Sequence, residues 1–287
     1  MAYAIRFDGS QPVDLDAIDT RGADTIDKAE GEKALDALVA ELGELQELLF
    51  AAGTHALLIV LQGMDTSGKD GTIGHVLDAM DPQGIQVWSF KVPTAEERAH
   101  DFLWRHHLRT PALSMVGVFN RSYYEAVLVE LVKGIVTPEV ALSRYPHIND
   151  FEQLLSQSNT IVAKFFLDIS KEEQKERLLA RQEEVAKWWK LNVADWEERD
   201  RWHEYMAAYE AAIAATATTW APWYVVPADR KWYRNLAVAE TLVQTLRPYR
   251  DDWIAALKDH GEEALAALRK AGFAGGDGET TRQQDGK

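Results

Sequence analysis

The sequence predicts an α/β protein with a parallel sheet covered by helices on both faces, and three observations support this class. Short, nearly continuous apolar runs alternate with longer segments of helical periodicity. Several of these helical segments begin with a side chain that can cap a helix. A glycine-rich loop directly follows the first apolar run and precedes a helical pattern. Strands buried on both faces give continuous apolar runs, so this alternation is typical of a three-layer sandwich.

Five apolar runs are the expected strands. They cover residues 55–63, 85–90, 114–119, 161–169 and 223–228. Each run is short and rich in aliphatic or aromatic side chains, as expected of strands that are buried on both faces. The sequence therefore predicts a five-stranded parallel sheet.

Helix starts and domain boundaries follow from capping pairs and periodicity. Pairs that can cap a helix are Asp27 with Glu30, Thr94 with Glu97, Ser170 with Glu173, and Asp195 with Glu198. Residues 1–26 lack periodicity and are expected to form an arm. Residues 27–248 are expected to form one catalytic-size domain, and residues 249–287 a C-terminal helix with a disordered tail.

Composition excludes several classes of function. The chain has 287 residues and no cysteine, which rules out disulfides, thiolate metal sites and cysteine nucleophiles. Its formal net charge of −15 makes duplex nucleic acid a poor partner. No apolar run approaches the roughly 20 residues that a membrane span needs, and the first residues do not resemble a signal peptide. We expect a soluble, cytoplasmic protein that binds neither nucleic acid nor membrane.

The loop after the first expected strand has the spacing of a phosphate-binding motif. Gly63, Gly68 and Lys69 fit G-x-x-x-x-G-K between a strand and a helix, which is the context that the motif requires. In such a loop, backbone N–H groups, the helix N-terminus and the lysine all present positive charge to phosphate oxygens. A tight turn with a merely solvated lysine is the alternative, and the context favours the phosphate site.

Two carboxylates in this loop region indicate a metal ion. Asp70 stands where serine or threonine usually contacts Mg²⁺, and Asp65 lies at the loop apex. A carboxylate beside phosphates calls for a cation between them, so we expect Mg²⁺ close to the loop. Asp65 is the preferred ligand, because Asp70 can instead complement the helix dipole. The third expected strand leads into Asn120, where a P-loop enzyme usually has a metal-binding aspartate, and this also favours Asp65.

Arginines supply the expected positive charge around the loop. Arg121 follows the third expected strand at its carboxyl end, where ligands bind in open α/β sheets, although a surface ion pair is the alternative. Arg177 and Arg181 are four residues apart and share a helix face. We predict a helical lid at about residues 177–198 that brings cations over transferring phosphates. A solvated helix with Glu–Lys pairs is the alternative for this segment.

Several long motifs, taken together, resemble those of the family-2 polyphosphate kinases. They are "GMDTSGKDGTI" as the Walker A loop, "FNRSYYE" as the Walker B region, "FLDISKEEQKERLLAR" before the lid, and "WAPWYVVPADRKWYRNLAV" as the C-terminal strand and helix. The resemblance covers roughly residues 30–247. Within the family, the pattern is most similar to the short, single-domain subgroup that acts on nucleoside mono- and diphosphates.

The resemblance implies a P-loop kinase-like fold and a polyphosphate:nucleotide phosphotransferase that uses Mg²⁺. It implies transfer of the terminal phosphoryl group of inorganic polyphosphate to purine nucleoside mono- and diphosphates, AMP to ADP and ADP to ATP. The expected catalytic residues are Asp65, Lys69, Arg121 and Arg181, with Asp65 also the metal ligand. The expected substrate-binding residues are Gly63, Gly68, Asp70, Gly71, Thr72, Lys91, Asn120, Glu125, Arg177, Lys187 and Lys190.

Two other functions share part of this pattern. An ATP-dependent nucleoside monophosphate kinase has the same loop, lid and sheet, but usually carries serine or threonine at the position of Asp70. A non-catalytic P-loop module would bind nucleotide or polyphosphate without turnover, and Asp65 with the lid arginines argues against it. The apolar, tryptophan-rich C-terminal half and the N-terminal helix favour a homo-oligomer.

Overall fold

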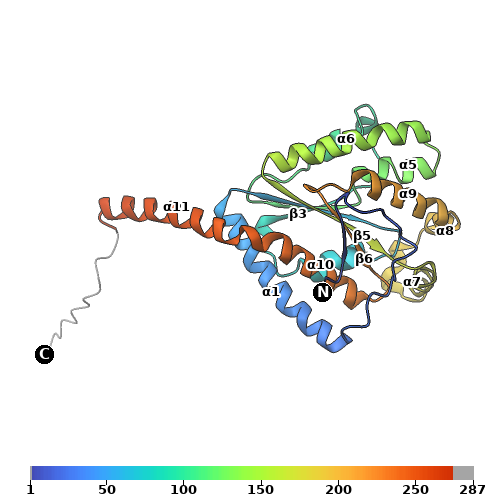
Figure 1. Ribbon diagram of the computed structural model, residues 1–287, viewed down its shortest axis with the longest axis horizontal. Helices are drawn as coiled ribbons and strands as arrows, with labels where there is room; N and C mark the ends of the chain where they lie inside the picture. The colour runs from blue at the N-terminus through green and yellow to red at the C-terminus, as the bar shows by residue number, and fades with distance from the viewer. Residues whose placement is uncertain (1, 274–287) are drawn as a thin grey trace.

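The computed structural model describes residues 2–273 and places their strands in one six-stranded sheet (Figure 1). The strands are β1 (Ile5–Phe7), β2 (Ala56–Gln62), β3 (Ile85–Ser89), β4 (Val116–Asn120), β5 (Thr160–Asp168) and β6 (Trp223–Pro227). Their order is β1-β6-β5-β2-β4-β3. Strand β1 pairs antiparallel with β6, and the other four pairings are parallel. The five expected strands are confirmed.

The expected count of five strands was wrong, because the segment expected to be an arm contributes β1. This strand has only three residues, of which only Phe7 is buried. A strand this short carries no usable alternation of apolar and polar residues. The sheet is therefore mostly parallel, with one antiparallel strand at its edge, as is common in large α/β sheets.

The prediction that all five runs are buried on both faces was wrong for β3. Every residue of β2 and of β5 is buried, but no residue of β3 is, and Val87 is 45% exposed. Strand β3 lies at the other edge of the sheet, where β4 is its only neighbour among residues 2–273. An edge strand has one open side, so its apolar residues are covered less completely than those of a central strand.

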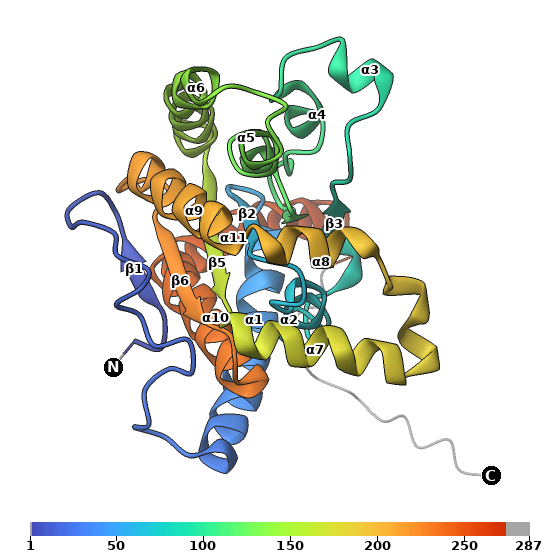
Figure 2. The ribbon, with the colours of Figure 1, turned by 90° about the vertical axis from the view of Figure 1, so that its right-hand side faces the viewer.

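The helices cover both faces of the sheet. They are α1 (Lys28–Ala52), α2 (Lys69–Val76), α3 (Ala95–Arg98), α4 (Trp104–His107), α5 (Val129–Val132), α6 (Pro138–Gln157), α7 (Lys171–Glu183), α8 (Val193–Asp200), α9 (Trp202–Thr216), α10 (Lys231–Leu246) and α11 (Arg250–Lys270). Short 3₁₀ turns lie at Pro82–Gly84, Tyr123–Ala126, Val185–Lys190 and Arg247–Tyr249. Helices α1, α2 and α10 lie on one face, and α5, α6 and α9 lie on the other (Figure 2). This is the predicted three-layer arrangement.

Three of the four predicted capping pairs begin helices, namely Asp27 with Glu30, Thr94 with Glu97, and Ser170 with Glu173. The fourth prediction was wrong, because α8 begins at Val193 and its N-cap is Asn192, whose side chain accepts a hydrogen bond from the N–H of Ala194. Asp195 lies inside the first turn of α8. Its carboxylate forms an ion pair with Arg181, so a residue with N-cap chemistry is used here for a tertiary contact.

The strand order places the glycine-rich loop (residues 63–68) at the switch point of the sheet. Strand β2 lies between β4 and β5, and the chain first builds one side of the sheet and then the other. In open α/β sheets, ligands bind in the crevice at the carboxyl end of the strands where the order reverses. That crevice is where β2 ends and α2 begins.

Between residues 2 and 273, no helix is both long enough and apolar enough to cross a membrane. The expected tail lies largely outside the described residues, which end at Phe273. The boundaries at residues 26 and 248 remain predictions.

Candidate active site

The glycine-rich loop has a conformation and a packing environment that require its glycines. Gly63 has a φ of 148°, and a Cβ there would lie 2.7 Å from the carbonyl oxygen of Leu167. Gly68 has a φ of 105°, and a Cβ there would lie 1.7 Å from a guanidinium nitrogen of Arg234. Both values lie in a region that only glycine adopts easily. The two glycines of the motif are therefore fixed by backbone geometry and by close neighbours.

Lys69 folds back over the loop from which it emerges. Its Nζ donates hydrogen bonds to the carbonyl oxygens of Gly63, at 2.6 Å, and of Met64, at 3.2 Å. Burial lowers the pKa of Lys69, and Arg121 lowers it further, while Asp65 opposes this shift. The ammonium group thus adds positive charge at the N-terminus of α2, where a bound anion is favoured.

An ion pair joins the loop to the end of β4. Arg121 Nη2 lies 2.6 Å from Asp65 Oδ1, and its Nη1 lies 3.2 Å from Glu125 Oε2. The backbone of Arg121 is left-handed, with a φ of 61°, and its N–H donates to the carbonyl of Leu61. Burial alone would raise the pKa of Asp65, but Arg121 and Lys69 outweigh it and lower that pKa below its usual value. Asp65 is therefore an ionised carboxylate at neutral pH.

The second loop carboxylate connects the loop to the predicted lid. Asp70 Oδ1 accepts a hydrogen bond from Asn120 Nδ2 at 2.8 Å, and Asp70 Oδ2 pairs with Lys190 Nζ at 2.7 Å. The side chain of Asp70 is 63% exposed, in contrast to 16% for Asp65. Lys190 ends the 3₁₀ turn that follows α7, so this contact joins that turn to the first turn of α2.

Arg177 and Arg181 lie on the same helix but contact different partners. The guanidinium of Arg177 donates to the backbone carbonyls of Thr66 at 3.0 Å, Ala228 at 2.8 Å and Asp229 at 2.7 Å. Arg177 therefore ties the loop to the connection between β6 and α10. Arg181 pairs with Asp195 at 3.0 Å, inside the lid. Burial, with the Asp65 carboxylate second, raises the pKa of Asp195 to about 6.

A cavity of about 820 Å³, here called the loop cavity, lies between the glycine-rich loop, α7 and the 3₁₀ turn Val185–Lys190, here called the lid turn. All the predicted site residues line it except Gly63, Thr72 and Glu125. Thr72 is buried, and Glu125 faces a neighbouring cavity. The structure thus brings the predicted cations together with Asp65 and Asp70 in one cleft.

The neighbouring cavity has a volume of about 660 Å³ and a more apolar lining. Its apolar residues include Phe102, Val129 and Ile135. Phe90, Lys91 and Arg121 line both cavities, so the two meet at these side chains. A ligand in one cavity can therefore approach a ligand in the other across Arg121.

Sequence reasoning missed several charged residues of the two cavities. Lys231, at the start of α10, lines the loop cavity, and Arg105 and Arg144 line the neighbouring one. Arg105 is buried and donates to the carbonyl of Lys91 at 2.9 Å. The motif "DRKWYRN" gave a signal for Lys231. The two arginines come from helices that no motif marked, and only tertiary folding brings them to the site.

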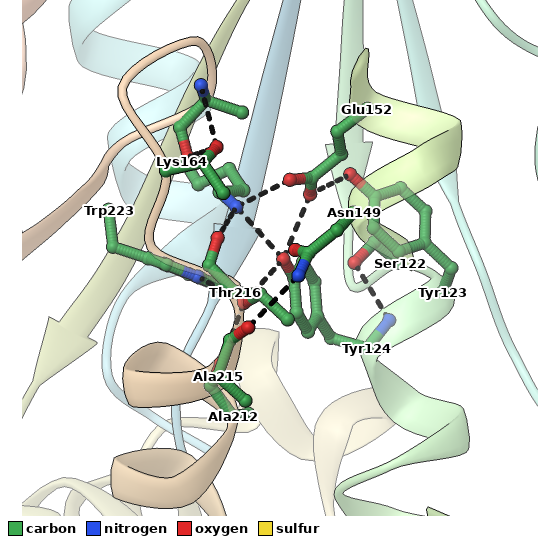
Figure 3. Close-up of polar contacts among 12 residues, drawn as sticks. Ser122, Tyr123, Tyr124, Asn149, Glu152, Lys164, Ala212, Ala215, Thr216 and Trp223 are labelled. Carbon is green, nitrogen blue, oxygen red and sulfur yellow. Dashed lines mark hydrogen bonds and ion pairs between the residues drawn. The ribbon is translucent and has the colours of Figure 1, made fainter. Parts of the chain in front are cut away.

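A fully buried polar network supports the turn that carries Glu125 (Figure 3). Lys164 Nζ pairs with Glu152 Oε2 at 2.6 Å and donates to the carbonyl of Thr216 at 2.8 Å. Glu152 Oε1 accepts hydrogen bonds from the hydroxyls of Tyr123 and Tyr124, each at 2.8 Å. These tyrosines begin the 3₁₀ turn after β4. The network therefore fixes the backbone directly beyond Arg121.

A glycine-rich loop at the switch point, a lysine folded over it and a cavity lined by cations define a P-loop protein of the kinase type. The chain belongs to the polyphosphate kinase 2 family, because residues 25–252 match the family model "Polyphosphate kinase 2 (PPK2)". The family resemblance predicted from the sequence is confirmed.

Two named relatives and one solved structure are similar to this chain. The chain is 50% identical over 214 residues to the AMP/ADP-polyphosphate phosphotransferase of Meiothermus ruber, which covers 75% of this chain and 80% of that relative. It is 39% identical over 188 residues to the polyphosphate:AMP phosphotransferase of Pseudomonas aeruginosa, covering 66% of this chain and 38% of the relative. The crystal structure of polyphosphate kinase 2 from Arthrobacter aurescens superimposes with a TM-score of 0.80 at 45% identity, covering 86% of this chain and 92% of that one.

Proposed function

We propose that this protein transfers the terminal phosphoryl group of inorganic polyphosphate to nucleoside mono- and diphosphates, converting AMP to ADP and ADP to ATP. The observation that carries the proposal is the meeting of two cavities at Lys91 and Arg121. One is rich in cations and suits a polyanion, and the other combines cations with apolar surface. The activities named for the relatives from Meiothermus ruber and Pseudomonas aeruginosa support the same reaction.

The loop cavity is the proposed donor site. Its cations come from the start of α2, the ends of β3 and β4, α7, the turn after α7 and α10. They are Lys69, Lys91, Arg121, Arg177, Arg181, Lys187, Lys190 and Lys231. A linear polyphosphate carries a repeating charge and no base, so a row of cations can bind it without a base pocket. The side chain of Trp189, which is 79% exposed, also lines this cavity.

The neighbouring cavity is the proposed acceptor site. Phe102, Val129 and Ile135 offer apolar surface to a purine base, and Lys91 lies where the acceptor phosphate would meet the donor. A pocket with mostly apolar lining and a few placed charges is typical of small-ligand sites. A purine nucleotide with one or two phosphates fits this cavity, because its base would meet the apolar residues and its phosphates would meet Lys91.

Mg²⁺ is the proposed cofactor, and the residues at the loop fit it. Within residues 2–273, no three histidine, aspartate or glutamate side chains form a metal cage. Mg²⁺ does not need one, because it is usually held by one or two carboxylates together with phosphates and water. Asp65 is an ionised carboxylate in the donor site, and we propose it as the protein ligand. Asp65 would hold the ion, which would offset the negative charge of the phosphates.

The protein's own side chains position the phosphates and offset their charge. Lys69 and the helix N-terminus hold the donor end, and Arg121 lies between the two cavities. Arg121 and Arg181 would stabilise charge on the equatorial oxygens during in-line transfer. The contact of Lys190 with Asp70 would hold the turn after α7 beside the bound phosphates.

Nucleotide analysis tests the proposed reaction. Purified protein with Mg²⁺ and polyphosphate is expected to convert AMP to ADP and ADP to ATP, because each acceptor presents a terminal phosphate beside Arg121. In a matched set of reactions, ATP replaces polyphosphate as the donor, and AMP, CMP or dTMP is the acceptor. Turnover only with ATP would instead indicate a nucleoside monophosphate kinase, and binding without turnover in either set would indicate a non-catalytic module. A cytoplasmic location and a homo-oligomer remain predictions.

A further inference from the structure

A buried arginine lies directly behind the glycine-rich loop. Arg234, in the first turn of α10, is 3% exposed, and its Nη1 donates to the carbonyl of Ser67 at 3.3 Å. Its Nε and Nη2 donate to Asn235 Oδ1 at 3.2 and 2.8 Å. A Cβ on Gly68 would lie 1.7 Å from Arg234 Nη1, and a Cβ on Gly71 would lie 3.1 Å from its Nη2. The guanidinium therefore fills the space that the two glycines leave open.

The loop backbone separates this guanidinium from the cleft. Gly68 and Gly71 line the loop cavity, whereas Arg234 does not. The loop backbone thus lies between the charge of Arg234 and the place where phosphates would bind to the loop. Across so little space, and with little water between them, two charges interact much more strongly than in solution.

The positive charge of Arg234 has no acidic partner in the described chain. Burial, with Arg177 second, lowers the pKa of Arg234 to about 10, and no carboxylate offsets these effects. The guanidinium is therefore still protonated at neutral pH, and the charged group that shifts its pKa, Arg177, is another cation. A buried charge without an opposite partner destabilises a folded protein. The charge is balanced only if an anion binds on the other side of the loop.

We propose that Arg234 is a positioning residue of the donor site, whose buried charge strengthens polyphosphate binding from behind the loop. This inference rests on the proposed function, because it requires that the loop bind donor phosphate. It also gives a reason for glycine at position 71, where the backbone is helical. A side chain there would crowd the guanidinium.

The test compares variants that remove the charge with one that keeps it. Arg234→Met and Arg234→Gln are neutral, and Arg234→Lys retains the positive charge. The neutral variants are expected to raise the KM for polyphosphate roughly tenfold, because they remove a nearby charge in a poorly screened site. Their KM for AMP should change little. Arg234→Lys should recover most of the polyphosphate affinity.

A second readout separates this role from a merely structural one. The melting temperature of each protein is measured alone and with inorganic tripolyphosphate. The neutral variants are expected to melt no lower than the wild type when alone, but to lose most of the increase that tripolyphosphate causes. A structural role predicts the reverse, namely a lower melting temperature alone and an unchanged increase with ligand.

Lys69→Met is the control for the donor site itself. If it abolishes the tripolyphosphate effect, the loop binds donor phosphate and the result for Arg234 decides the inference. An unchanged KM for polyphosphate in the neutral variants would then overturn it. The inference would also be overturned if both neutral variants failed to fold while Arg234→Lys folded. The charge would then stabilise the protein without any ligand. A tripolyphosphate effect that is absent in the wild type, or unchanged in Lys69→Met, would overturn the donor-site assignment and the inference together.

Discussion

Asparagine in place of Asp65 is expected to lower kcat by about a thousandfold, the scale of losing one well-placed electrostatic group at a reacting centre. The substitution removes the ionised carboxylate that we assign to Mg²⁺ and breaks the 2.6 Å ion pair with Arg121. Asparagine has nearly the same shape, so the fold should be retained. Removing a negative charge from a site for polyanions should leave the KM for polyphosphate unchanged or lower. Steady-state kinetics with polyphosphate and AMP measure both quantities.

Asp70→Asn is the matched control for this prediction. Asp70 is close to the same loop, but its side chain is 63% exposed and its contacts are to Asn120 and Lys190. We expect its kcat to fall by less than about tenfold, because exposed charge pairs contribute little. Near-normal turnover of Asp65→Asn beside a large loss in Asp70→Asn would show that the metal ligand is Asp70.

Methionine in place of Lys164 is expected to destabilise the folded protein by about 3–5 kcal/mol, the cost of leaving one partner of a buried ion pair unpaired. Lys164 and Glu152 are both fully buried, and their charged atoms lie 2.6 Å apart (Figure 3). Without the lysine, the hydrogen bonds that remain to Glu152 from residues 2–273 are those of Tyr123 and Tyr124. Denaturant unfolding measures the change in the free energy of unfolding.

The double variant Lys164→Met/Glu152→Gln isolates the effect of the unpaired charge. Glutamine leaves no charge in the core, and its carbonyl can still accept from the tyrosines. The double variant should therefore be more stable than Lys164→Met alone. Equal or lower stability of the double variant would mean that the unpaired charge of Glu152 does not cause the loss.

The sequence alone was sufficient to predict the features that depend on a local pattern of residues. The five buried or half-buried strands follow from continuous apolar runs, and the cation-lined cleft follows from the G-x-x-x-x-G-K spacing at the end of β2. Strand β1 was missed because three residues carry no periodicity. Asp195 was mistaken for a cap, because its side chain chemistry is the same in a cap and in an ion pair.

Residues that act through tertiary contacts could not be assigned from spacing. Arg177 had the helical position of a phosphate ligand, yet most of its hydrogen bonds go to carbonyls of the loop and of the β6–α10 connection. Arg234 belongs to a motif that marked the family, but its position behind Gly68 depends on how α10 packs. The Lys164–Glu152 pair links a strand to a helix 12 residues away, and no local signal marks it.

We propose that donor and acceptor occupy two separate cavities, which meet at Lys91 and Arg121. Calorimetric titration of AMP, with Mg²⁺ present, tests it most directly when performed with and without a saturating polyphosphate analogue whose bridging oxygens are replaced by methylene groups. We predict that AMP binds at one site per chain in both titrations. Displacement of AMP by the analogue would show that the two ligands share one site, and would contradict the assignment of donor and acceptor to separate cavities.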